Sequence, residues 1–208
     1  MPRTTRAAIG PEDRAVSVYI AGNHAEGLVD HLLARLTRRP DRPLHEAWTH
    51  SRVGFELADG RRVYFEAIFR EGWTGPHPEE KAEAWADKHP HRRIERLWIG
   101  DLTTLAVDRI WTRAKAMVEV WPYSPGQLLW IYAAIRMGIR VPKSPRAVVC
   151  SEGVARVAGP TVDVSNGKPA DQVTPEDNRA AALPLAFLVE HYPPAGTAGQ
   201  IDRRHVDP

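Results

Sequence analysis

Hydrophobic and polar residues alternate along several short stretches in the first half of the chain. The stretches are Val16–Ile20, His50–Leu57, Arg62–Phe69 and, more weakly, Arg92–Ile99. A period of two is typical of β-strands that bury one face, so each stretch predicts a strand. Residues 58–60, Ala-Asp-Gly, separate the second and third stretches, and Asp-Gly between alternating runs favours a hairpin. We therefore expect a small antiparallel sheet built around this hairpin.

Apolar residues recur at helical spacing in other stretches, and these predict helices. The predicted helices cover Glu26–Leu36, Glu79–Lys88, Asp101–Val118 with Asp101 as the cap, and residues from Ser124 to about Met137. Residues 124–127, Ser-Pro-Gly-Gln, have the features of a capping box, and residues 174–177 form a second start signal of the same kind. Between these elements we expect a break at residues 22–23, a loop over 72–78 and a final strand or edge over 183–192.

Cys150 is the only cysteine in the chain, and we expect it at the start of a helix. Val154, Val157 and Ala158 follow it at helical spacing, and residues 159–160, Gly-Pro, end the helix. Unpaired backbone N–H groups and the helix dipole favour negative charge at a helix N-terminus, so the thiolate is favoured over the thiol. Cys150 is therefore a candidate nucleophile, and the alternative is an inert cysteine packed in the core.

The length and composition fit one globular domain. The chain has 208 residues, of which 43% are hydrophobic, enough for a single sizeable core. We expect a loose N-terminal segment over residues 1–14, one domain over 15–192 and a disordered tail over 193–208. We expect an α+β fold, in which the small antiparallel sheet packs against helices that include the cysteine-bearing helix.

The charge balance and cysteine count restrict the partners and the compartment. Lys plus Arg is 28 and Asp plus Glu is 26, so a net charge of +2 gives no argument for nucleic-acid binding. One cysteine cannot form an internal disulfide, which suits a reducing compartment. We see no signal peptide and no apolar run that could span a membrane, and we expect a cytoplasmic protein.

A cysteine enzyme needs a base beside the sulfur and a third group that orients the base. His50 is the best candidate base. It shares one face of its predicted strand with Arg52 and Gly54, and the glycine leaves room for another group to approach closely. Glu66 on the partner strand is the candidate orienting group. A two-residue turn would pair Glu66 with Val53, on the face away from His50. A three-residue loop over 58–60 would place Glu66 opposite Arg52, on the His50 face, and Ala-Asp-Gly suits that second register.

Other residues are candidates for binding rather than for chemistry. Trp73, Trp121 and Tyr123 could line a substrate groove, with core packing as the alternative. The backbone N–H of Cys150 or Ser151 could hold an oxyanion. His89 and His91 are too weak a motif for a metal site, because no cysteine or acidic partner stands at ligand spacing. We expect neither a metal nor an organic cofactor.

Three separated stretches resemble one known family. Residues 49–67 resemble the histidine hairpin of the NlpC/P60 papain-like superfamily, in the circularly permuted order that puts histidine before cysteine. That branch includes the YiiX/YaeF-like hydrolases and the lecithin retinol acyltransferase-like proteins. Residues 149–152, Val-Cys-Ser-Glu, resemble its nucleophile motif, and residues 173–177 resemble the Thr-Pro-x-Asp segment that follows. Tyr123 and the helix at Gln127–Leu129 resemble the element before the cysteine.

The resemblance implies a permuted papain-like fold, with Cys150 as nucleophile, His50 as base and Glu66 as the polar third member. It implies hydrolysis of an amide, such as a peptidoglycan-type peptide or an N-acyl amino acid, or a related acyl transfer. A catalytically inactive relative that binds a peptide or glycan, or a structural protein, is the alternative. The sequence departs from the family at two places. Arg52 stands where the family usually has its histidine, and Gly153 replaces a larger apolar residue.

Overall fold

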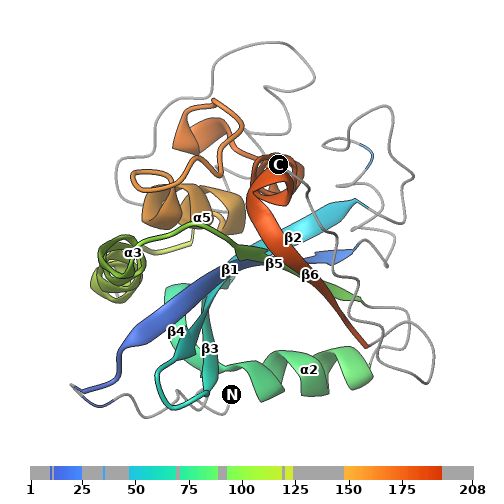
Figure 1. The fold of residues 1–208 in the computed structure, drawn as a ribbon. Helices are drawn as coiled ribbons and strands as arrows, with labels where there is room; N and C mark the ends of the chain where they lie inside the picture. Colours follow the sequence, from blue (N-terminus) through green and yellow to red (C-terminus); the bar gives the residue numbers. More distant parts are fainter. Residues whose placement is uncertain are drawn as a thin grey trace.

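A six-stranded antiparallel sheet forms the centre of the protein (Figure 1). The computed structural model describes residues 10, 12–24, 35, 47–68, 71–88, 93–118, 120–123 and 148–193. The strands are β1 Ala15–His24, β2 Trp48–Leu57, β3 Arg62–Ile68, β4 Gly72–Pro78, β5 Ile94–Ile99 and β6 Ala186–Tyr192. Their order across the sheet is β4-β3-β2-β1-β5-β6, and each neighbouring pair is antiparallel. The predicted α+β class, with helices against an antiparallel sheet, is confirmed for the described residues.

Helices lie on both faces of the sheet (Figure 1). They are α2 Glu79–Asp87, α3 Thr104–Met117, α5 Cys150–Ala158 and α6 Pro175–Ala182, with 3-10 turns at Ala170–Gln172 and Leu183–Leu185. The larger core cluster joins α3, α5 and α6 to one face and is centred on Phe55, Phe65 and Trp111. The smaller cluster lies under α2 and includes Tyr19 and Trp98. Of the described helices, none is long and apolar enough to cross a membrane.

The β2–β3 hairpin has the second of the two registers considered from the sequence. Phe55 pairs with Val63 and Val53 pairs with Phe65, and the Leu57 N–H donates to the Arg61 carbonyl at 2.8 Å. Three residues, 58–60, therefore form the loop, and Gly60 has a φ of +86°, the left-handed conformation that glycine adopts readily. Continued by one step in each strand, this register puts Glu66 opposite Arg52, on the face that carries His50.

Two sequence expectations about strand limits were wrong. β1 does not break at Gly22 but continues to His24. Gly22 lies against the indole of Trp48, where a Cβ would come within 2.1 Å of the ring, so the glycine provides close packing inside a strand. Residues 72–78, expected as a loop, form strand β4 at the edge of the sheet. An edge strand accommodates Pro76 and Pro78 because proline needs no ladder partner on its outer side.

The helix starts agree with the sequence with one exception. Thr174 and Asp177 form the predicted capping box at the start of α6. Thr103, and not Asp101, caps α3, since the Ala106 N–H donates to the Thr103 hydroxyl at 3.2 Å. The predicted strand at the chain's end is present as β6, an edge strand. The helices predicted after Glu26 and Ser124, and most of the predicted N-terminal segment and tail, lie outside the described residues.

Candidate active site

The structure brings together the three residues that the sequence proposed for chemistry. His50 Nε2 lies 2.7 Å from Glu66 Oε2, across the β2–β3 hairpin. The Cys150 thiol and the His50 ring are hydrogen-bonding partners. Because Glu66 occupies Nε2, Nδ1 is the ring nitrogen left for the sulfur. His50 therefore bridges a carboxylate and a thiol, as a base that is oriented by a third group must do.

Cys150 is the first residue of α5, and the chain before it is fixed by the core. Val149 is the N-cap, with an extended backbone, and Val148 forms a parallel bridge with Tyr123. α5 packs on β2 and buries most of its residues. The Glu152 side chain accepts a hydrogen bond from the Val149 N–H, and Arg156 binds the same carboxylate. These two contacts stabilise the first turn of α5.

Three neighbours, His50, Ser51 and Ser151, stabilise a negative charge on the sulfur. Burial raises the pKa of the Cys150 thiol, but the charge of His50, its hydrogen bond and the backbone N–H groups of Ser51 and Ser151 lower that pKa more, so the net direction is down. The thiol is 6% exposed, so these donors act where little water competes. His50 and Ser51 lie beyond the β2–β3 pairing, which ends at Val53, and this leaves the Ser51 N–H available to the sulfur.

The pKa of His50 moves in the complementary direction. Burial lowers the pKa of the imidazole, but the charge and hydrogen bond of Cys150 and then those of Glu66 raise it from 6.5 to about 10. Burial also raises the pKa of the Glu66 carboxyl, while the His50 hydrogen bond and charge lower it below its ordinary value. Together these shifts favour a thiolate, an imidazolium and a carboxylate at neutral pH.

Trp73 packs in the core. Of the two roles considered from the sequence, a groove residue or a core residue, the structure shows the second. The Trp73 side chain is 1% exposed, and its indole N–H donates to the Ala114 carbonyl at 3.0 Å. The ring packs on Gly153 of α5, where a Cβ would come within 2.3 Å of it. Gly153 therefore lets the Trp73 ring pack directly against α5.

Ser151 contributes its backbone and not its side chain to the site. The hydroxyl is buried and donates to the Val173 carbonyl at 2.6 Å, so it ties α5 to the segment before α6. Its backbone N–H points to the Cys150 sulfur. The Ser151 hydroxyl thus makes a structural hydrogen bond, while the backbone role proposed from the sequence fits this geometry.

Tyr123 and Trp121 lie at the half-buried margin of the larger core. Burial raises the pKa of the Tyr123 hydroxyl, and the Cys150 charge raises it further, so the phenol lies within electrostatic range of the sulfur. Trp121 stacks on the Arg156 guanidinium at 4.7 Å from the ring centroid. Tyr123 is thus within electrostatic range of Cys150, whereas Trp121 lies over the last turn of α5.

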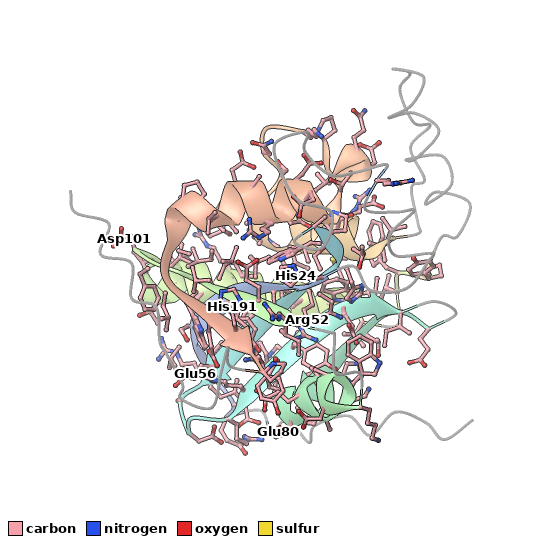
Figure 2. The ribbon with its side chains drawn as sticks, turned by 90° about the vertical axis from the view of Figure 1, so that its right-hand side faces the viewer. His24, Arg52, Glu56, Glu80, Asp101 and His191 are labelled. Carbon is pink, nitrogen blue, oxygen red and sulfur yellow. The ribbon has the colours of Figure 1, made fainter. Side chains whose placement is uncertain are left out.

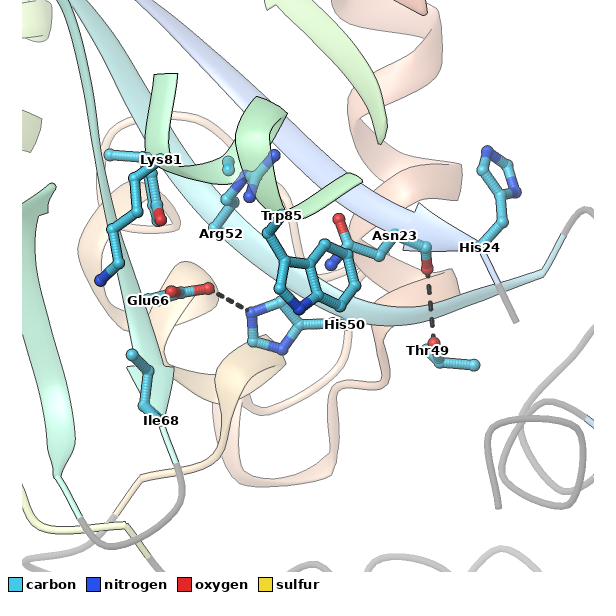
Figure 3. A pocket seen from close by; sticks show the side chains of 11 residues that line it. Asn23, His24, Thr49, His50, Arg52, Glu66, Ile68, Lys81 and Trp85 are labelled. Carbon is cyan, nitrogen blue, oxygen red and sulfur yellow. Dashed lines mark hydrogen bonds and ion pairs between the residues drawn. The ribbon is translucent and has the colours of Figure 1, made fainter. Parts of the chain in front are cut away.

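A pocket of about 400 Å³ lies between the hairpin and α2 and reaches His50 and Glu66 (Figure 3). Its lining comes from β1, β2, β3 and α2. The lining residues are Asn23, His24, Thr49, His50, Arg52, Tyr64, Glu66, Ile68, Lys81, Ala82 and Trp85. This volume lies in the range of small-molecule sites. The sequence analysis missed Lys81 and Trp85, although their separation of four residues on a charged helix was a signal that both face the same way.

Searches for relatives and for metal sites gave no further assignment. Comparisons of the chain with protein-family models, with curated proteins and with solved structures found no match. Within the part of the chain that the structure describes, no three His, Cys, Asp or Glu side chains are grouped to hold a metal ion. Cys150, His50 and Glu66 are therefore the residues whose geometry bears on function.

Proposed function

We propose that the protein is a cysteine hydrolase with a permuted papain-like arrangement, in which an acyl group is transferred to Cys150 and then to water. The observation that carries this proposal is the position of His50 between the Cys150 thiol and the Glu66 carboxylate. The order along the chain, a histidine hairpin followed by a cysteine at a helix start, supports it. So does the resemblance of both segments to NlpC/P60 proteins.

In the proposed reaction the Cys150 thiolate attacks the carbonyl carbon of an amide. The backbone N–H of Cys150, at the open first turn of α5, donates to the oxyanion that forms. The His50 imidazolium gives its proton to the departing amine nitrogen, the C–N bond breaks and a thioester remains on the sulfur. Water then attacks the thioester, His50 accepts the proton of that water, and the carboxylic acid product leaves.

Glu66 keeps the His50 ring in position through both steps. Its carboxylate accepts a hydrogen bond from the Nε2–H group. This bond directs Nδ1 to the sulfur and stabilises the imidazolium. The Cys150 charge influences the pKa of Tyr123, which supports the proposal that Tyr123 contacts the substrate near the scissile bond. The substrate class is an amide of a peptide or of an N-acylated amino acid, and the chemistry requires no metal or organic cofactor.

Detection of the acyl-enzyme tests the proposal. The protein is mixed with a panel of N-acyl and peptidyl p-nitroanilides, quenched in acid and measured by intact mass and peptide mapping. We expect one acyl adduct, on Cys150, together with p-nitroaniline release that falls by about 100-fold or more in His50→Ala, in line with the usual size of general acid-base catalysis. Ser151→Ala is the matched control and should keep the adduct. Release that persists in Cys150→Ala, or no adduct with any member of the panel, would contradict the proposal.

A further inference from the structure

The pocket beside His50 contains a buried cation that is incompletely paired. Arg52 is 2% exposed, and within the described residues its Nε has no hydrogen-bond partner. Its Nη2 is 3.4 Å from Glu79 Oε1, a long contact. The same carboxylate is bound more closely by Arg96 Nε at 2.9 Å and by the Tyr19 hydroxyl at 2.5 Å. A guanidinium held away from water with a free donor is costly unless a ligand completes its hydrogen bonds.

Arg52 borders the pocket and contacts Glu79 at the start of α2. The side chain extends from β2 toward α2 and lies over the ring of Tyr64, at 4.7 Å from the centroid (Figure 2). Both residues line the pocket. Tyr64 fixes the plane of the guanidinium from one side, so the group is held in place before a ligand arrives. Such preorganisation lowers the entropy lost on binding.

Lys81 on α2 supplies a second positive charge to the same pocket (Figure 3). Partial burial lowers the pKa of its ammonium, while the charges of Glu66 and Glu71 raise that pKa by less. The Glu66 carboxylate that shares the pocket is already bound by His50 at 2.7 Å. Arg52 and Lys81 are the cations that line this pocket, and a carboxylate is a group that both side chains can bind.

We propose that this pocket binds the free carboxylate of the leaving group, so that the substrates are acyl amides of amino acids with an unblocked carboxyl end. The inference rests on the proposed function and specifies its substrate class. The pocket reaches His50 and Glu66, but Cys150 is not among its lining residues. An occupant therefore lies beside the group that protonates the departing amine without covering the sulfur. When the C–N bond breaks, that amine takes the His50 proton and leaves as the free amino acid.

Binding to an inactive variant tests the pocket without requiring turnover. Cys150→Ala protein is titrated calorimetrically with the N-acetyl derivatives of alanine, leucine, lysine and glutamate, and with the matching carboxamides of each. We expect at least one carboxylate to bind about 10-fold or more tightly than its carboxamide. Lys81→Met in this background should bring the two affinities within about 2-fold. Lys88→Met, an exposed lysine outside the pocket, is the matched control and should preserve the preference.

Arg52→Gln provides a second variant for the same comparison, and thermal unfolding confirms that each variant is folded before its affinities are read. Equal affinity for carboxylates and carboxamides, or no binding by any of the eight compounds, overturns the carboxylate pocket even if the protein hydrolyses amides. A carboxylate preference that disappears in Lys81→Met supports the pocket even if Cys150 forms no acyl adduct. The failure of the pocket and the failure of the hydrolase proposal are therefore distinguishable.

Discussion

The reactivity of Cys150 toward a small alkylating agent is the most direct measure of its pairing with His50. In the structure the sulfur is 6% exposed, and burial alone would raise its pKa above the ordinary 9.0. The charge and hydrogen bond of His50 are the largest influences in the opposite direction. His50→Ala removes both and leaves the two backbone N–H donors of Ser51 and Ser151. We therefore expect the variant thiol to titrate near or above its ordinary pKa.

The size of the effect follows from the ionised fraction. A thiol with a pKa of 9.0 is ionised in about one molecule per thousand at pH 6. The native thiol, with its lowered pKa, is ionised in a far larger fraction at the same pH. A thiolate of lower pKa is a weaker nucleophile, which offsets roughly 10-fold of this advantage. We expect iodoacetamide to alkylate native Cys150 about 20 times faster than His50→Ala at pH 6.

The assay follows carbamidomethylation by intact mass between pH 4 and pH 10, in native protein, His50→Ala and His191→Ala. His191 is exposed on β6, so its substitution controls for the loss of a histidine as such (Figure 2). The native profile should rise well below pH 9, and the His50→Ala profile should shift upward. Identical profiles in the native protein and His50→Ala would refute the pairing, and an inert native thiol would favour the non-catalytic alternative.

Three smaller predictions follow from single contacts. Glu66→Gln keeps a hydrogen-bond acceptor for His50 but removes the charge, so alkylation at pH 6 should slow by about 10-fold. Because the pKa of Glu66 is lowered in the folded protein, its contribution to stability is present above the unfolded value of 4.5 and is lost as the pH falls through the folded value. The difference in urea stability between native protein and Glu66→Gln should shrink accordingly, and a constant difference would contradict this account. Gly153→Ala should destabilise by about 1–3 kcal/mol through contact with Trp73, although helix propensity alone predicts a gain of about 1 kcal/mol. Denaturant midpoints decide the sign, with Gly100→Ala as a control that has ordinary contacts. Ser151→Ala should cost about 1–3 kcal/mol by leaving the buried Val173 carbonyl unpaired, yet leave the alkylation profile unchanged, whereas a shifted profile would show that the hydroxyl acts on the sulfur.

The local patterns of the sequence were enough to predict the hairpin strands, but they were not enough to predict which residues meet in the site. Local signals were sufficient for the strands on either side of residues 58–60 and for the capping box at Thr174, because turn chemistry and capping act over a few residues. The register was narrowed to two choices, and the left-handed Gly60 is the feature that separates them. The contact of Cys150 with His50 spans a hundred residues of chain, so no local pattern encodes it. The face of the predicted strand made His50 the candidate base, and the resemblance to a family supported the pairing.

The errors share a physical cause. Residues 72–78 contain glycine and two prolines, so intrinsic propensity opposed a strand, but pairing with β3 at the sheet edge overrode it. That pairing also directs the Trp73 side chain into the core. Trp73, which was expected in a groove, packs against α5 instead. The pocket residues Lys81 and Trp85 were missed because an amphipathic helix with charged residues usually presents them to solvent. Their role depends on how α2 crosses the hairpin, which is a tertiary property.

The contact of His50 with Glu66 and the position of Arg52 beside it both follow from the spacing of these residues in β2. In the hairpin register Arg52 lies opposite Glu66, and His50 is its diagonal neighbour. Diagonal neighbours are about 7–8 Å apart at Cα, within reach of an aromatic side chain, and the His50 ring spans this distance to Glu66. The place directly opposite Glu66 is then free for Arg52, whose longer side chain extends past the hairpin to Glu79 and the pocket. A histidine at position 52 would be too short to reach Glu79. Because His50 lies two residues from Arg52 along β2, the His50 ring contacts Glu66 and a cation lies beside that contact.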